Sequence, residues 1–144
     1  MGESLLAAYL QPLLDKLAPG PRMNFAHQQG FHSELRKWRS LLRQIKLVSG
    51  DAEEKQMNDV EVKRWVDELL LLAYDADDVL EELYHKALQR HNRSSSDSAT
   101  SSSQVQDLLA QIQSITTRFV YIDEEKSDLG LKERPGVMSS LVSP

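Results

Sequence analysis

The chain has 144 residues, of which 40% are hydrophobic and 27% are charged, as in an ordinary globular domain. It contains no cysteine, which excludes disulfides, thiolate metal ligands and a cysteine nucleophile. The net charge of −5 is unevenly spread, because residues 1–50 carry +4 and residues 51–90 carry −7. An acidic central segment argues against nucleic-acid binding and favours attraction between the two halves or contact with separate protein partners.

The first expected helix covers about Ser4 to Ala18. Its leucines recur at steps of three and four, so they form one apolar stripe, and Leu5, Tyr9 and Leu14 widen it. The stripe consists of Leu6, Leu10, Leu13 and Leu17. The sequence Pro-Gly-Pro at 19–21 predicts the stop. A helix of about 15 residues is roughly 22 Å long, too short to cross a hydrocarbon core of about 30 Å alone.

The second expected helix covers about Asn24 to Val48, and the residues at 49–50, Ser-Gly, are predicted to loosen or end it. Its apolar seam has a heptad-like repeat and consists of Phe31, Leu35, Trp38, Leu42 and Ile45. A basic stripe runs beside this seam at the same spacing and consists of Arg36, Arg39, Arg43 and Lys46.

The third expected helix is the longest, from about Asp59 to Arg90, with Asn58 and Glu61 as candidate capping residues. Its seam is made of Val62, Val66, Leu69, Ala73, Ala76, Leu80, Leu83 and Ala87, broadened by Trp65, Leu72 and Val79. The fourth covers about Gln104 to Asp123, with a capping box of Ser103 and Gln106. Its seam is made of Val105, Leu108, Ile112, Ile115, Phe119 and Ile122.

Seven of the ten residues from Ser94 to Ser103 are serine, so we expect a disordered loop between the third and fourth helices. Four amphipathic helices that bury their seams together predict an all-α fold, an up-down antiparallel four-helix bundle over residues 1–128. Residues 129–144 are expected to be a linker to a domain absent from this chain. The same seams would also be satisfied by helical hairpins that dimerise.

Catalytic and metal-binding patterns are missing from the sequence. Glu82 and His85 have the Glu-x-x-His spacing of di-iron carboxylate bundles, but no other histidine supplies the second half of such a site. Neither a Gly-x-Ser-x-Gly elbow nor a glycine-rich phosphate loop occurs. We therefore expect no enzyme activity and no metal site. Trp38 and Trp65 are expected to anchor the core.

Two stretches carry a resemblance to a known family. They are Asp-Ala-Glu-Glu-Lys-Gln at 51–56, and Val-Lys-Arg-Trp-Val-Asp-Glu-Leu at 62–69 running on to Ala-Tyr-Asp-Ala-Asp-Asp-Val-Leu-Glu-Glu at 73–82. Together they resemble the Rx-type coiled-coil domain at the N-terminus of plant nucleotide-binding leucine-rich-repeat (NLR) immune receptors. The family's acidic "EDVID" motif corresponds here to Asp77, Asp78, Val79, Leu80 and Glu81. The likeness covers most of residues 1–130.

The resemblance implies a signalling and autoinhibitory interaction module in defence, the hypersensitive response and cell death. Its partners would be the receptor's own nucleotide-binding and leucine-rich-repeat domains, with the acidic motif facing basic residues there. Self-association and a host cofactor protein are further implied partners. ADP or ATP would bind only in the absent nucleotide-binding domain, so no cofactor is expected in this segment.

The resemblance also implies a cytoplasmic protein whose first helix contacts the plasma membrane after activation and oligomerisation. The residues that would make this contact are Leu6, Leu10, Leu13, Leu14 and Leu17. A different class of function remains open from the residues alone. The chain would then be a generic helical scaffold or adaptor that dimerises through its seams, without signalling activity of its own.

Overall fold

The computed structural model describes residues 5–92 and 102–133, and the regular structure in these ranges is entirely helical. The helices are α1 (Leu5–Lys16), α2 (Pro21–Gln29), α3 (His32–Leu47), α4 (Ser49–Lys55), α5 (Val60–Asn92) and α6 (Ser102–Asp128). The all-α prediction is confirmed. Most of the expected serine-rich loop, and the tail from residue 134, lie outside the described residues.

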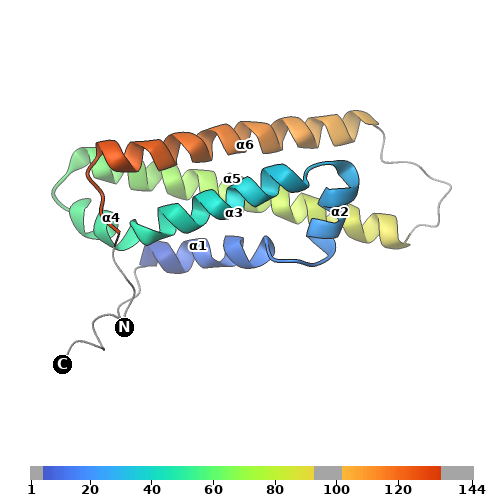
Figure 1. Cartoon of the computed structure of the whole chain (residues 1–144), viewed down its shortest axis with the longest axis horizontal. Coiled ribbons are helices and arrows are strands. Elements are labelled where there is room, and N and C mark those ends of the chain that lie inside the picture. Colours follow the sequence, from blue (N-terminus) through green and yellow to red (C-terminus); the bar gives the residue numbers. More distant parts are fainter. Residues whose placement is uncertain (1–4, 93–101, 134–144) are drawn as a thin grey trace, which may run out of the picture.

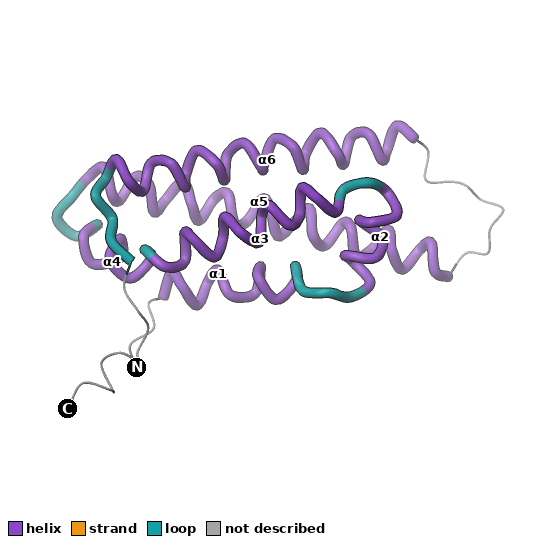
Figure 2. The backbone as a smooth tube through the Cα atoms, in the orientation of Figure 1, coloured by secondary structure: helices purple, strands orange, loops and turns teal. Residues whose placement is uncertain are grey.

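The four longer segments α1, α3, α5 and α6 lie along the long axis of the molecule, and the chain reverses direction from each to the next (Figures 1 and 2). Helix α6 packs on both α3 and α5, and α1 packs on the same two helices. Helix α2 packs between α3 and α5, and α4 packs against α1 and α5 near the opposite end. From α1 to α5, no connection between consecutive helices is longer than four residues.

The prediction of one helix over Asn24–Val48 was wrong, because two helices, α2 and α3, occupy this region. Gly30 adopts a left-handed conformation with φ of 85° and ends α2. The Phe31 amide then donates to the Ala26 carbonyl at 2.7 Å, and the Gly30 amide donates to His27 at 3.2 Å. These two bonds form a Schellman motif, which satisfies carbonyls that the end of a helix leaves free. The missed signal is a glycine directly before a buried aromatic residue.

The ends of several helices also differ from expectation. Pro21 does not only stop the chain after α1 but begins α2, where its fixed φ suits the first helical turn. Asp59, rather than Asn58, caps α5, since its carboxylate accepts from the amides of Glu61 at 2.9 Å and Val62 at 3.3 Å. The chain turns helical again at Ser49, so α4 follows α3 at once.

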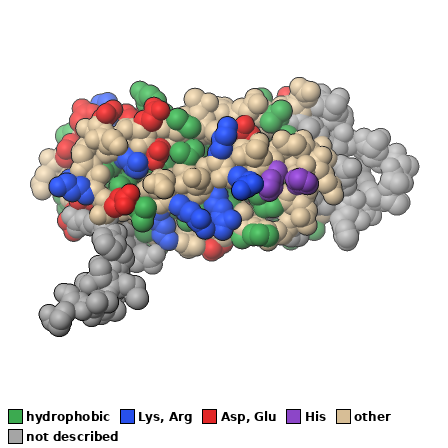
Figure 3. Space-filling model, in the orientation of Figure 1, with side chains coloured by type: hydrophobic (Ala, Val, Ile, Leu, Met, Phe, Trp, Pro, Cys, Tyr) green, Lys and Arg blue, Asp and Glu red, His purple; other side chains and the backbone are tan. Residues whose placement is uncertain are grey.

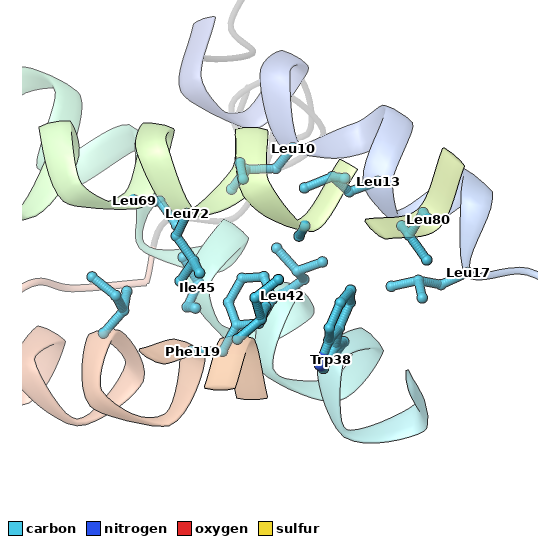
Figure 4. Close-up of a cluster of buried hydrophobic side chains, with 14 of the residues drawn as sticks. Leu10, Leu13, Leu17, Trp38, Leu42, Ile45, Leu69, Leu72, Leu80 and Phe119 are labelled. Carbon is cyan, nitrogen blue, oxygen red and sulfur yellow. The ribbon is translucent and has the colours of Figure 1, made fainter. Parts of the chain in front are cut away.

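One core contains every predicted seam residue whose side chain the structure describes, and Figure 4 shows part of it; Ala87 and Val105 lie outside these residues. Trp38 is fully buried, donates its indole N–H to the Thr116 hydroxyl at 2.8 Å, and meets the Phe119 ring edge-on with centroids 5.6 Å apart. Trp65 is buried and donates to the Ile122 carbonyl at 2.9 Å. Both tryptophans therefore fill the core and also satisfy their polar atoms, as burial requires.

Candidate functional site

The acidic motif at 77–81 lies in the middle of α5, and its five residues divide between three environments. Val79 and Leu80 are buried in the core. Asp78 is exposed, whereas Asp77 and Glu81 are half-buried and turned toward α1. Positions four apart lie on one side of a helix, which explains why Asp77 and Glu81 act together while Asp78 points elsewhere. The motif is therefore not a single outward-facing patch.

Lys16, at the last position of α1, is the partner of both inward-turned carboxylates. Its Nζ forms an ion pair with Asp77 and lies 2.7 Å from Oε2 of Glu81. Burial alone would lower the pKa of Lys16, but the hydrogen bonds and charges of the two carboxylates outweigh this effect and raise that pKa above its ordinary value. The lysine also stands at a helix C-terminus, where a positive charge is favoured. Sequence reasoning missed Lys16 because it lies 61 residues from Asp77.

The leucine stripe of the first helix faces the core rather than solvent. Leu6, Leu10 and Leu13 are buried, Leu17 is buried just after the helix end, and Leu14 is partly buried against the same cluster. Figure 4 shows three of these leucines pointing at the side chains of α3 and α5. The expectation that Leu5 and Tyr9 widen the stripe was wrong, because they are 78% and 44% exposed. These two residues lie on the side of α1 that packing leaves free.

The start of α1 is held by a residue of α4. Oε1 of Glu53 accepts a hydrogen bond from the Leu6 amide at 3.3 Å. Amides in the first turn of a helix have no partner within the helix, so this contact supplies one. Helix α1 is thus fixed by polar contacts at both ends and by leucines between them. Glu53 belongs to the first stretch that carries the family resemblance, but no sequence pattern pairs it with Leu6, which lies 47 residues away.

The basic stripe of α3 lies on the surface. Arg36 and Arg43 are exposed, Arg39 is half-buried, and Lys46 donates to the side-chain oxygen of Gln11 on α1. Figure 3 shows Lys and Arg side chains gathered across the middle of this face. The stripe therefore gives α3 a positively charged outer surface. The exposed carboxylates Asp67 and Asp78 belong to a different helix, α5.

A group of carboxylates surrounds Glu125 near the end of α6. Burial raises the pKa of Glu125, and the negative charges of Glu68, Asp128 and Glu61 raise it further, against the opposing effect of Arg64. Like charges of this kind oppose folding at neutral pH. Within residues 5–92 and 102–133, no three His, Asp or Glu side chains come together in an arrangement that could hold a metal ion.

None of the helices in those same ranges is long and apolar enough to cross a membrane.

More than half of the chain matches the model of a known protein family. The family model described as the Rx N-terminal domain matches residues 9–106. No solved structure is significantly similar to the chain.

Several curated relatives are plant disease resistance proteins by name. The putative disease resistance RPP13-like protein 1 of Arabidopsis thaliana is 29% identical over 148 residues, covering 92% of this chain and 14% of the relative. The putative disease resistance protein RGA1 and the disease resistance protein RGA2 of Solanum bulbocastanum are each 34% identical over 80 residues, covering 56% of this chain and 8% of each relative. The chain therefore spans a small fraction of the length of these relatives.

Proposed function

Since this chain belongs to the Rx N-terminal domain family of plant disease resistance proteins, we propose that it is the signalling and autoinhibitory interaction module of an intracellular NLR immune receptor. Its working unit is an up-and-down bundle of α1, α3, α5 and α6, to which α2 and α4 are short additions. The module contributes to oligomerisation of the receptor and to defence and cell-death signalling. It has no catalytic role.

The observation that carries this proposal is the way α1 is held. Its leucines are buried, and Lys16 at its end pairs with Asp77 and Glu81 of the acidic motif. Because the ion pairs are partly exposed, they can exchange for other charged partners at low cost. A helix fixed by exchangeable contacts suits a resting state from which signalling starts when α1 is freed. The freed stripe would then contact the plasma membrane, and the resting protein would be cytoplasmic.

The partners that we propose are the receptor's own nucleotide-binding and leucine-rich-repeat domains, a host cofactor protein, and further copies of the same receptor. Asp78 is the residue of the motif best placed to meet basic residues of another domain, because it is exposed. Asp77 and Glu81 would serve that contact only after leaving Lys16. ADP or ATP would bind in the nucleotide-binding domain of the receptor.

Expression of residues 1–144 in leaf tissue tests whether the module signals, with cell death scored at matched protein abundance. A stripe variant such as Leu10→Glu would place a charge at a fully buried site and unfold the domain, so it cannot isolate function. The sharper variant is Leu5→Glu with Tyr9→Glu, since both side chains are exposed on α1. Met57→Glu is the matched control, because Met57 is 79% exposed and lies outside the helices.

Cell death from the native chain and from Met57→Glu, but not from the α1 variant, would support signalling through the outer side of the first helix. Equal cell death from all three would reject signalling through the outer side of α1. A native chain that causes no cell death but dimerises through its apolar seams would favour the generic scaffold instead.

The role of the acidic motif is tested by binding to a co-expressed remainder of the receptor. We expect Asp78→Lys to weaken this binding, because it reverses an exposed charge and leaves the Lys16 contacts in place. Asp67→Lys is the control, since Asp67 is exposed on the same helix about three turns earlier and pairs with Lys63. Equal binding by the native chain and Asp78→Lys would show that Asp78 does not take part in the contact.

A further inference from the structure

Helix α4 lies near one end of the molecule, beside the start of α1 and the last described residues of the chain (Figure 1). It is only seven residues long, from Ser49 to Lys55. A helix this short has little stability of its own and depends on the packing around it. Val48 just before it and Ala52 within it are buried, and α4 packs on both α1 and α5.

The first link runs from α4 to α1 through Glu53, whose carboxylate accepts from the Leu6 amide. Helix α1 has no acidic residue of its own in its first described turn. The carboxylate of Glu53 therefore supplies the negative charge that a helix N-terminus favours, from a different helix. Glu53 thus caps the first described turn of α1 from another helix.

The second link runs from α4 to the segment that follows α6. Oδ2 of Asp51 accepts from the Lys132 amide at 2.9 Å and lies 3.0 Å from Nζ of Lys55. Lys55 also donates to the Gly130 carbonyl at 3.1 Å, and Leu131 between these contacts is only 9% exposed. The Asp51 side chain is 3% exposed, so each donor that it loses is costly. Asp51 and Lys55, one helical turn apart, therefore hold residues 130–132 in place.

We propose that α4 couples residues 130–132 to the start of α1, so that displacing this segment loosens the first helix. The two carboxylates stand two residues apart on one short helix, and a disturbance that shifts or frays α4 moves both. Losing the Lys132 amide removes a donor from a buried carboxylate, which favours local opening of α4 and takes Glu53 away from Leu6. This coupling assigns a role to the Asp51–Gln56 stretch.

The use of this coupling in signalling rests on the proposed function. In a receptor, the chain beyond residue 133 would lead to the nucleotide-binding domain, and a movement of that domain would pull on the anchored segment. Helix α4 would pass this pull to α1. The coupling itself is a property of the isolated domain and is open to measurement there.

Hydrogen exchange on the 144-residue chain tests the coupling. We expect Lys55→Met and Leu131→Ala each to speed exchange of the amides from Leu6 to Leu10 by about tenfold, with α3 and α6 unchanged. Glu53→Gln should speed the same amides while the Lys132 amide stays protected. Lys63→Met is the matched control, because it breaks another lysine–carboxylate pair four residues apart and should leave α1 unchanged.

Faster exchange at Lys132 in the Lys55 and Leu131 variants, with native exchange in α1, would overturn the coupling. If Leu131→Ala unfolds the whole chain, Lys55→Met decides, since Lys55 is 40% exposed and its loss leaves the core intact. A chain that shows the coupling but causes no cell death would refute the proposed signalling role alone. The two failures are therefore distinguishable.

Discussion

Lys16 at the end of α1 places its Nζ 2.7 Å from Oε2 of Glu81, a residue of the acidic motif on α5. The same ammonium group pairs with Asp77 one turn earlier. Lys16 thus links α1, the helix that we propose is released in signalling, with the acidic motif, which we propose binds other domains. Because a single charge serves both carboxylates, any basic partner that draws the motif away also weakens the hold on α1.

We expect Lys16→Met to lower the free energy of unfolding by about 1 kcal/mol, because two partly exposed ion pairs are lost. Urea unfolding followed by circular dichroism measures this change. The effect should shrink at high salt and vanish above the raised pKa of Lys16, since the ion pairs stabilise the fold below pH 10.5 and are lost as pH rises through that pKa. Equal stability of the variant and the native chain at low salt would contradict the assignment.

The hydrogen bond from Trp38 to Thr116 should contribute to stability inside the core. We expect Thr116→Val to cost about 1–2 kcal/mol, because it keeps the side-chain shape but leaves the buried indole N–H without its acceptor. In a double-mutant cycle with Trp38→Phe, the combined loss should be smaller than the sum of the single losses. Strict additivity would show that the two side chains do not interact.

Glu125 should destabilise the fold at neutral pH, since it is ionised among Glu68, Asp128 and Glu61. We expect Glu125→Gln to raise the free energy of unfolding by about 0.5 kcal/mol at pH 7. A raised folded pKa means that the protonated form is favoured on folding, so the advantage of the variant should fade as pH falls through that pKa toward 4.5. Glu124→Gln is the control, because it removes a neighbouring exposed charge from the same helix end. An equal gain from both variants would point to a helix-end effect alone.

Gly30→Ala should cost about 1 kcal/mol, because alanine disfavours the left-handed conformation that ends α2. A Cβ at this position would meet nothing within 4 Å, so the cost is conformational rather than steric. Gly20→Ala serves as the control, since Gly20 has an extended φ of 163° and should tolerate the change within about 0.5 kcal/mol. Thermal unfolding of the two variants compares them directly, and equal midpoints would argue against the proposed role of Gly30.

The helical seams could be predicted from the sequence. A helix that buries one face has apolar residues that recur with its period of 3.6 residues, and this pattern is local in the chain. Leu35, Trp38, Leu69 and Phe119 were all placed on seams from their spacing, and all are buried. The acidic motif at 77–81, by contrast, came from the family resemblance and not from any apolar period. Helix breaks were harder, since Gly30 required knowledge of the backbone angle rather than of the apolar pattern.

By itself, then, the sequence determined the all-helical class, the apolar face of each long helix and the family to which the chain belongs. Only the tertiary structure decided which charges meet. Any of the 17 Lys and Arg residues could have paired with Asp77 or Glu81 on composition alone. The choice of Lys16, and of Glu53 for the Leu6 amide, depends on how the helices pack, because electrostatic contacts need a few ångströms of separation in space and leave no period in the chain.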